Sequence, residues 1–198
     1  MSAASASEVR RGRPPSTTPR ELEVIAMRLF SERGFDDTTV EDIAAAAGVS
    51  SRTFFRYFDT KAAVLWHHFD AEVEALRLAF AAVDDAVPMM EAIRAVVVSV
   101  NRYTAADVPE LRMRINLIGE APALQASAGP HYDAWEQQVI AFAARRLGTR
   151  ADALLPVAIG RATLAVCRAA YEQWVGRADA DLTHYLDEGL AALGRGFA

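Results

Sequence analysis

The sequence predicts an all-α protein, and three observations support that fold class. Apolar residues recur every three or four positions along most of the 198 residues, which places them on one face of a helix. The 11 glycines and 8 prolines stand mostly between these periodic segments. No two-residue alternation is long enough for a strand. With 52% hydrophobic and 24% charged residues, the chain has the composition of a folded protein.

The chain opens with a polar segment and a first helix. Residues 1–17 are rich in Ser, Ala and Arg, and we expect them to form a mobile arm. Thr18 can cap a helix and Glu21 stands at the capping-box position, with a proline between them in the first turn. Leu22 begins the helical apolar spacing, and Gly34 is expected to end the helix.

Three more helices are expected in the first part of the chain. The second runs to Gly48, the third to Phe58 and the fourth to about Val83. Each start is preceded by a side chain that can accept a hydrogen bond from a free backbone amide: Thr38 or Thr39, then Ser50, then Asp59 or Thr60.

The remainder of the chain predicts five further helices. They follow Pro88, Pro109 and Pro130, or occupy residues 152–175 and 182–193. The segment at 152–175 is unusually rich in small residues. The sequence therefore predicts about nine helices in all.

The net charge of −5 is spread unevenly. Nine basic side chains balance nine acidic ones in residues 1–65, whereas residues 66–198 hold twelve basic and seventeen acidic side chains. Within the first part, residues 50–61 carry three basic side chains against one acidic. A local basic cluster, rather than the overall pI, indicates contact with phosphates.

Cysteine content and hydropathy favour a cytoplasmic protein. Cys167 stands alone, which fits a reducing compartment. The start of the chain lacks the apolar core of a signal peptide. The apolar segment 154–175 is interrupted by Arg161, Arg168 and Glu172, so we expect no membrane span.

Residues 38–58 are typical of a helix-turn-helix that reads DNA. A short helix, a glycine turn and a second short helix follow one another, and the major groove is wide enough to admit such a helix. Phe54 and Phe58, four residues apart, are expected to face inward. That leaves Arg52 and Arg56 facing the groove, and Arg52 suits a bidentate contact with guanine. The alternative is that both are solvated surface arginines.

The same segment resembles the DNA-binding domain of TetR-type transcriptional regulators of bacteria. The shared motifs are L-F-x-x-x-G-F at 29–35, T-T-V-x-x-I-A at 38–44, A-G-V-S at 47–50 and F-F-x-Y-F-x-T-K ending at Lys61. The family often has tyrosine where Phe55 stands, so a hydroxyl for phosphate is lost there.

The resemblance implies the roles of individual residues. Ser51, Arg52 and Thr53 would contact bases or the groove, while Thr39, Tyr57 and Lys61 would contact phosphates. The full predicted set of DNA-binding residues in this domain is Thr39, Ser50, Ser51, Arg52, Thr53, Phe55, Arg56, Tyr57 and Lys61.

A second, separate DNA signal lies in the arm. Arg11-Gly12-Arg13-Pro14 resembles the core of an AT-hook, in which arginines beside a glycine enter the minor groove. The alternative is a basic tail that adds only non-specific attraction to phosphates. Both interpretations stay open.

The resemblance also implies how the chain is divided. The arm covers 1–17, the DNA-binding domain 18–65, and a helical effector-binding and dimerisation domain 66–198. The last two helices, residues 152–195, would form the homodimer, since their small residues and leucine stripe suit close helix packing; ordinary packing within one chain is the alternative. A dimer would present two recognition helices to half-sites about 34–36 Å apart.

Residues 110–118, together with Trp135, resemble acyl-ligand-sensing members such as the mycofactocin-system regulators. This implies a repressor that is released from a palindromic operator by a small hydrophobic effector of acyl type. An apolar pocket with a few polar groups would suit that effector. The candidate residues, for which plain core packing is the alternative, are Asn101, Arg112, Asn116, Tyr132, Trp135 and Gln138.

Two other function classes compete with a ligand-responsive regulator. An all-helical enzyme would draw on the histidines, and His68 with Glu72 has the spacing of a metal-ligand pair on a helix. No third ligand, nucleophile motif or phosphate loop accompanies that pair, so we expect no catalysis, metal or cofactor. His67 and His68 are expected at the junction of the two domains. The remaining class is a DNA-binding protein without a ligand.

Overall fold

The computed structural model describes residues 17–177 and 181–196, and within those ranges it contains ten helices and no strand. The all-α prediction is therefore confirmed. Arg11 and Arg13, the predicted minor-groove residues, lie outside the described residues. The helices are α1 (Pro19–Arg33), α2 (Val40–Ala46), α3 (Ser51–Phe55), α4 (Ala63–Ala81), α5 (Met89–Val100), α6 (Val108–Glu120), α7 (Pro122–Ser127), α8 (Gly129–Leu147), α9 (Leu154–Val175) and α10 (Leu182–Gly194).

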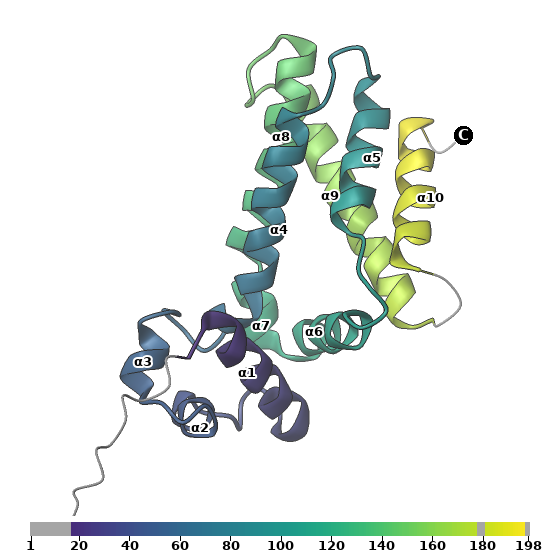
Figure 1. Ribbon diagram of the computed structural model, residues 1–198. Helices are drawn as coiled ribbons and strands as arrows, with labels where there is room; N and C mark the ends of the chain where they lie inside the picture. The colour runs from purple at the N-terminus through teal and green to yellow at the C-terminus, as the bar shows by residue number, and fades with distance from the viewer. Residues whose placement is uncertain (1–16, 178–180, 197–198) are drawn as a thin grey trace, which may run out of the picture.

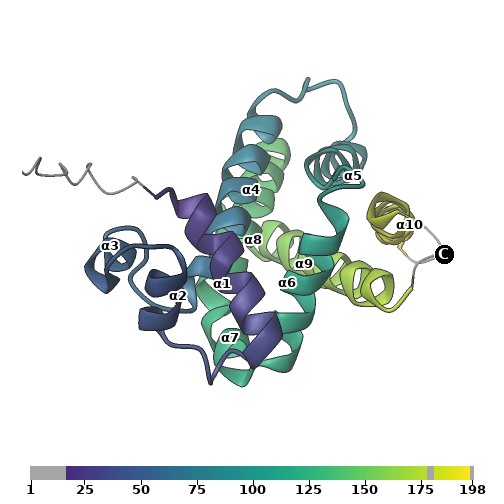
Figure 2. The same cartoon turned by 60° about the horizontal axis from the view of Figure 1, so that its bottom comes forward.

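The helices form two groups that share α4. Helices α1, α2 and α3 gather at one end of the molecule, and α4, α5, α8, α9 and α10 stand together as a bundle (Figure 1). Helix α6 runs beside α1 where the groups meet (Figure 2), and α1 also packs on α4. Helices α4 and α6 therefore connect the bundle to the small N-terminal domain.

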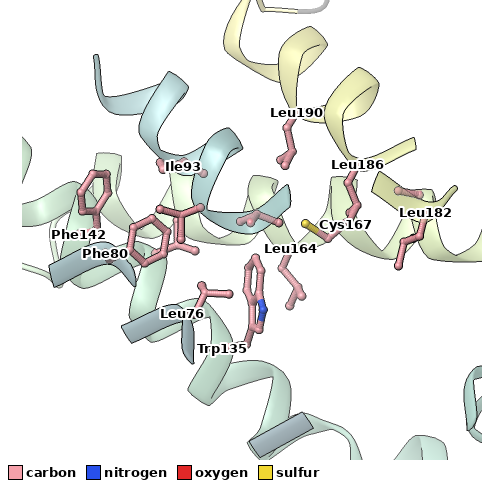
Figure 3. Close-up of a cluster of buried hydrophobic side chains, with 14 of the residues drawn as sticks. Leu76, Phe80, Ile93, Trp135, Phe142, Leu164, Cys167, Leu182, Leu186 and Leu190 are labelled. Atoms are coloured by element: carbon pink, nitrogen blue, oxygen red, sulfur yellow. The ribbon is translucent and has the colours of Figure 1, made fainter. Parts of the chain in front are cut away.

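Each group has its own apolar core. In the bundle, buried side chains from α4, α5, α8, α9 and α10, together with Leu111 of α6, form a core around Trp135, Leu164 and Cys167 (Figure 3). The second core joins α1, α2 and α3 to the first turn of α4, and it also takes in Leu117 and Leu124 of α6 and α7. The predicted boundary between residues 65 and 66 thus falls inside α4, and the small domain is completed by side chains from the C-terminal half.

Three of the predicted helix caps are present. Oγ1 of Thr18 accepts a hydrogen bond from the amide of Glu21, whose carboxylate accepts one from the amide of Thr18. Thr39, rather than Thr38, caps α2 in the same reciprocal way with Asp42. The Ser50 hydroxyl accepts from the amide of Thr53 at the start of α3.

Some boundaries differ from the prediction. Helix α3 ends at Phe55 instead of Phe58, and α4 begins at Ala63, where the amide donates to Oγ1 of Thr60 at 3.1 Å. Helix α7 was not predicted, which raises the described helices to ten instead of about nine. Its six residues are too few to show a helical period, and it is held by Leu124, which is fully buried in the second core.

The leucines of α10 serve the chain's own core. Leu182, Leu186 and Leu190, part of the stripe assigned to a dimer, are buried against α5 and α9. Gly160 of α9 also packs within the chain. The helices α8 and α9 are so close there that a Cβ at position 160 would lie 2.5 Å from Cγ1 of Ile140. For these residues the alternative of packing within one chain is the correct one.

Helix α9 keeps one face uncovered in the single chain. Along that face lie exposed apolar or small residues: Leu154, Leu155, Ala158, Ala165 and Ala169. By length and composition alone α9 is suited to cross a membrane, a test that core helices of soluble proteins also pass.

Candidate nucleic-acid interface and the adjoining cavity

The turn between α2 and α3 presents the third helix at the surface. Gly48 adopts a left-handed backbone with φ 68°, a conformation that costs glycine little. The amide of Val49 then donates to the carbonyl of Ala44 at 2.9 Å, which closes the turn. Ala44 and Phe54 are buried between the helices, whereas Ala45 and Ala46 are exposed.

The outer face of α3 carries the residues predicted to meet DNA. Phe54 and Phe58 are buried, as predicted, so the intervening positions point outward. Phe55 is 51% exposed, and the guanidinium of Arg52 is exposed without a hydrogen bond or ion pair to any residue that the structure describes. The face therefore offers one uncommitted guanidinium beside an apolar ring.

Arg56 and Tyr57 are engaged with each other and with the start of α1. Nη2 of Arg56 donates to the Tyr57 hydroxyl at 2.8 Å, and its guanidinium lies 4.7 Å from the centre of the Tyr57 ring. The hydroxyl in turn donates to the carbonyl of Thr17 at 3.0 Å. Because a phosphate can only accept hydrogen bonds from tyrosine, Tyr57 would have to release Thr17 to contact one.

The small hydroxyl residues around α3 are used within the domain. Thr39 donates to Asp42 at 2.6 Å in the α2 cap, and the Ser50 and Thr53 hydroxyls lie 3.1 Å apart. The Ser51 hydroxyl lies 3.4 Å from a carboxylate oxygen of Glu41 on α2. These side chains fix the shape of the surface, and their contacts with DNA stay a prediction.

Lys61 has a structural role that the sequence did not reveal. Its ammonium donates to the carbonyls of Phe35 at 2.5 Å and Thr38 at 2.8 Å, and it lies 4.1 Å from the centre of the Phe35 ring. Lys61 thereby ties the start of α4 to the link between α1 and α2. Two of its three N–H donors are used in this way, so at most one remains for a phosphate.

We expect the Lys61→Ala variant to be less stable as well as weaker in binding DNA. The two carbonyls lose their donor, at a cost of about 1–3 kcal/mol. Loss of one phosphate contact would also lower the salt slope of DNA binding by about 1. Urea unfolding and salt-dependent DNA titration measure the two effects. Unchanged stability would show that the hydrogen bonds of Lys61 to the two carbonyls do not stabilise the fold.

A cavity of about 710 Å³ lies within the bundle, next to the small domain. It is lined mainly by α4, α6, α8 and α9, with mostly apolar walls that include Trp66, Phe69, Ile115 and Trp135. Its volume falls within the range of small-molecule sites. Trp135, Leu164 and Cys167, labelled in Figure 3, form the border between this cavity and the bundle core.

Three of the six predicted pocket residues line the cavity: Asn101, Tyr132 and Trp135. The other three do not. Arg112 instead donates to backbone carbonyls at the end of α9, those of Trp174 and Val175 at 2.8 Å each, and so fastens α6 to α9. Asn116 is exposed, and Gln138 donates to the carbonyl one turn before it in α8.

Sequence reasoning missed a polar group in the cavity wall. Nε2 of His68 lies 3.2 Å from a carboxylate oxygen of Glu72, which also accepts a hydrogen bond from the Tyr103 hydroxyl. The hydrogen bond to Glu72 raises the pKa of His68, and burial raises that of Tyr103, which keeps its proton and remains a donor. The four-residue spacing of His68 and Glu72 was visible in the sequence, but it was considered only as a metal-ligand pair, for which no third ligand was found.

The remaining histidines are in aromatic or ion-pair contacts. His67 packs edge-on against Phe58 at the junction of the domains, as predicted, and His131 stacks on Trp66 and contacts Asp70. His184 lies on α10 beside Tyr185. In the part of the chain described, no three His, Cys, Asp or Glu side chains are grouped so as to hold a metal ion.

Two family models match this chain in adjoining ranges. Residues 25–66 match the model of bacterial regulatory proteins of the tetR family. Residues 87–198, more than half of the chain, match the model of the MftR C-terminal domain. The residues between the two matched ranges belong to α4 and the loop that follows it.

Curated relatives are similar over the same regions. The chain is 33% identical over 189 residues to MftR of Mycobacterium tuberculosis, named as a candidate mycofactocin biosynthesis transcriptional regulator, and the match covers 96% of both chains. It is 40% identical over 83 residues to the HTH-type transcriptional regulator EthR of the same species, covering 39% of this chain and 38% of EthR.

Solved structures share the fold. FadR of Thermus thermophilus, a repressor crystallised with lauroyl-CoA, has a TM-score of 0.56 and 23% identity, over 91% of this chain and 95% of its own. A SmeT–triclosan complex has a TM-score of 0.64 and 20% identity, over 88% and 90%. The exposed third helix, the fold and the matched models agree, and the chain belongs to the TetR family of DNA-binding transcriptional regulators, with an MftR-type C-terminal domain.

Proposed function

We propose that this protein is a repressor that binds a palindromic operator as a homodimer in the cytoplasm and is released by a hydrophobic effector. The observation that carries the proposal is the exposed, unpaired guanidinium of Arg52 on α3, beside Phe55. A guanidinium in the major groove reads guanine, and an apolar ring beside it suits a thymine methyl. Ser51, Thr53 and Arg56 would complete the groove contacts. Thr39, Tyr57 and Lys61 would contact phosphates.

Selection of bound duplexes from a random DNA library tests this proposal. We expect the enriched sequences to contain an inverted repeat, with half-sites one helical turn, about 34–36 Å, or a multiple of it apart. Light scattering of the complex should give an even number of chains per repeat. Enrichment of a single half-site, or of none, would contradict operator binding by a symmetric dimer.

The uncovered face of α9 is our candidate dimer interface. Its apolar and small residues would be buried against a second copy, and small side chains let two helices approach closely. The leucines of α10 are already used within the chain, so α10 would contribute its outer face: His184, Asp187 and Glu188.

The Ala165→Glu variant should be monomeric. A carboxylate in the middle of a close helix–helix contact would be buried without a partner, which such an interface does not tolerate. The matched control is Ala95→Glu, an exposed alanine on α5, which should leave the oligomeric state unchanged. Sedimentation velocity distinguishes the two states, and a dimeric Ala165→Glu variant would place the interface elsewhere.

The cavity is our candidate effector site. It lies against α4 and α6, the two bundle-side helices that contact α1 besides α2, so an effector there can move the DNA-binding domain. Asn101, Tyr132 and Trp135 would contact it. The related structures hold lauroyl-CoA, which carries an apolar dodecanoyl chain, in one case and the chlorinated aromatic triclosan in another. A coupling of about 1–3 kcal/mol would lower operator affinity about 5–150-fold.

A further inference from the structure

Arg114 of α6 joins three helices at the junction between the DNA-binding domain and the cavity. Its Nη1 donates to a carboxylate oxygen of Glu23 on α1 at 2.5 Å and to the carbonyl of Leu65 on α4 at 2.8 Å. Its Nη2 donates to Glu110 at 2.9 Å. The side chains of Arg114 and Glu23 are only 6% and 1% exposed. These bonds fix the position of α1 against α6.

One donor of the same guanidinium is uncommitted. Nε of Arg114 is buried and has no hydrogen-bond acceptor within the described part of the chain. A buried donor left unpaired costs about 1–3 kcal/mol. Arg114 lines both the large cavity and a second one of about 390 Å³, so its side chain lies where the two adjoin. Nε itself is covered in this conformation, so a molecule in the large cavity reaches it only when the guanidinium turns.

The surroundings indicate which acceptor would fit. The positive charge of Arg114 is already matched by Glu23 and Glu110, and Arg20 pairs with Glu110 at 2.5 Å. Glu72 lines the same two cavities, and Arg168 and Glu172, which also line the large one, balance each other in charge. A ligand carboxylate would therefore meet no unmatched positive charge there. A neutral carbonyl oxygen needs no further counter-charge, and the apolar walls suit the rest of the molecule.

We propose that Arg114 is the effector-sensing residue: its Nε–H binds the carbonyl oxygen of a neutral, mostly apolar molecule, and its Nη1 transmits binding to α1 through Glu23. This inference rests on the proposed effector response. A guanidinium is rigid and planar, so turning it toward a ligand at Nε also turns the Nη atoms away from Glu23 and Leu65. Helix α1 then loses its fixed place against α6.

The test uses two matched probes and the full-length protein. Monolauroylglycerol carries an ester carbonyl, and its dodecyl ether analogue has a methylene in that place. Quenching of tryptophan fluorescence reports binding, since Trp66 and Trp135 line the cavity. Without DNA, we expect the ester to bind roughly tenfold more tightly than the ether, as for one hydrogen bond to a charged donor.

Arg114→Lys keeps the charge opposite Glu23 but lacks the Nε–H, so the ester preference should fall to about one. Equal affinity of the parent for both probes, binding of neither, or a preference unchanged in Arg114→Lys would overturn the role of Arg114. Circular dichroism checks that the variant is folded.

Glu23→Gln provides a second variant that leaves Arg114 in place. This variant should keep the ester preference. The ratio of its operator affinities without and with saturating ester should fall toward one. Release equal to that of the parent would overturn the transmission through Glu23. The two proposals fail in different ways. If ether and ester release the operator equally, the protein responds to an effector but Arg114 does not sense it. If the ester binds preferentially but releases no operator, Arg114 binds the ligand but the protein is not regulated by it.

Discussion

The Arg52→Ala variant will lose about 1–3 kcal/mol of its preference for operator over unrelated DNA, the value of one good bidentate base contact. The side chain of Arg52 is exposed on α3 and makes no hydrogen bond or ion pair to any other described residue, so its removal should leave the fold intact. Binding to unrelated duplexes should change much less. Fluorescence anisotropy with both duplexes at the same salt concentration measures the difference.

A matched control for Arg52 is Arg28→Ala. Arg28 is an exposed arginine on α1, paired with Glu32 at 3.1 Å. Its replacement removes the same charge as Arg52→Ala, but at a distance from α3. It should leave the operator preference unchanged. If Arg52→Ala retained the full preference, another residue of the α3 face would carry the base contact.

Replacing Glu23 with alanine should destabilise the protein by about 3 kcal/mol. The change leaves Arg114 buried without its closest charged partner and weakens the junction between α1 and α6. The expected cost is at the lower end for a broken buried ion pair because Glu110 still contacts Arg114 at 2.9 Å. Urea unfolding followed by circular dichroism gives the free energy of unfolding.

Two further variants test the reason for that loss. Glu32→Ala breaks an exposed ion pair on the same helix and should cost less than about 1 kcal/mol. Glu23→Met combined with Arg114→Met removes both charges, and should be less harmful than Glu23→Ala alone. A Glu23→Ala variant that unfolds at the same urea concentration as the parent would show that the buried pair contributes little.

The predicted helices match the structure where local signals are strong. Thr18 with Glu21 and Ser50 with the amide of Thr53 act within three residues, so the sequence contains everything those caps need. The observed helix boundaries differ from the predicted ones where short turns intervene. Residues 56–62 continue the apolar pattern of α3, yet they form the turn that leads to α4. Helix α7 is too short to carry a pattern.

The candidate DNA interface was partly predictable. Inward packing of Phe54 and Phe58 follows from their spacing and implies that Arg52 faces outward. The hydrogen bonds of Lys61 and Tyr57 were not predictable, because their partners lie 23 to 40 residues away in the chain. Residue type alone indicated phosphate contacts, whereas both side chains bind backbone carbonyls of the domain.

The sequence by itself determined the all-α class and the turn between α2 and α3, because helical periodicity, caps and a glycine turn act over a few residues. The tertiary structure decided the rest. It brought Arg114 to Glu23, 91 residues away, buried the α10 leucines, and enclosed the cavity between helices that are distant in the chain. These features depend on how helices pack, and an apolar stripe fits a partner chain as well as its own core.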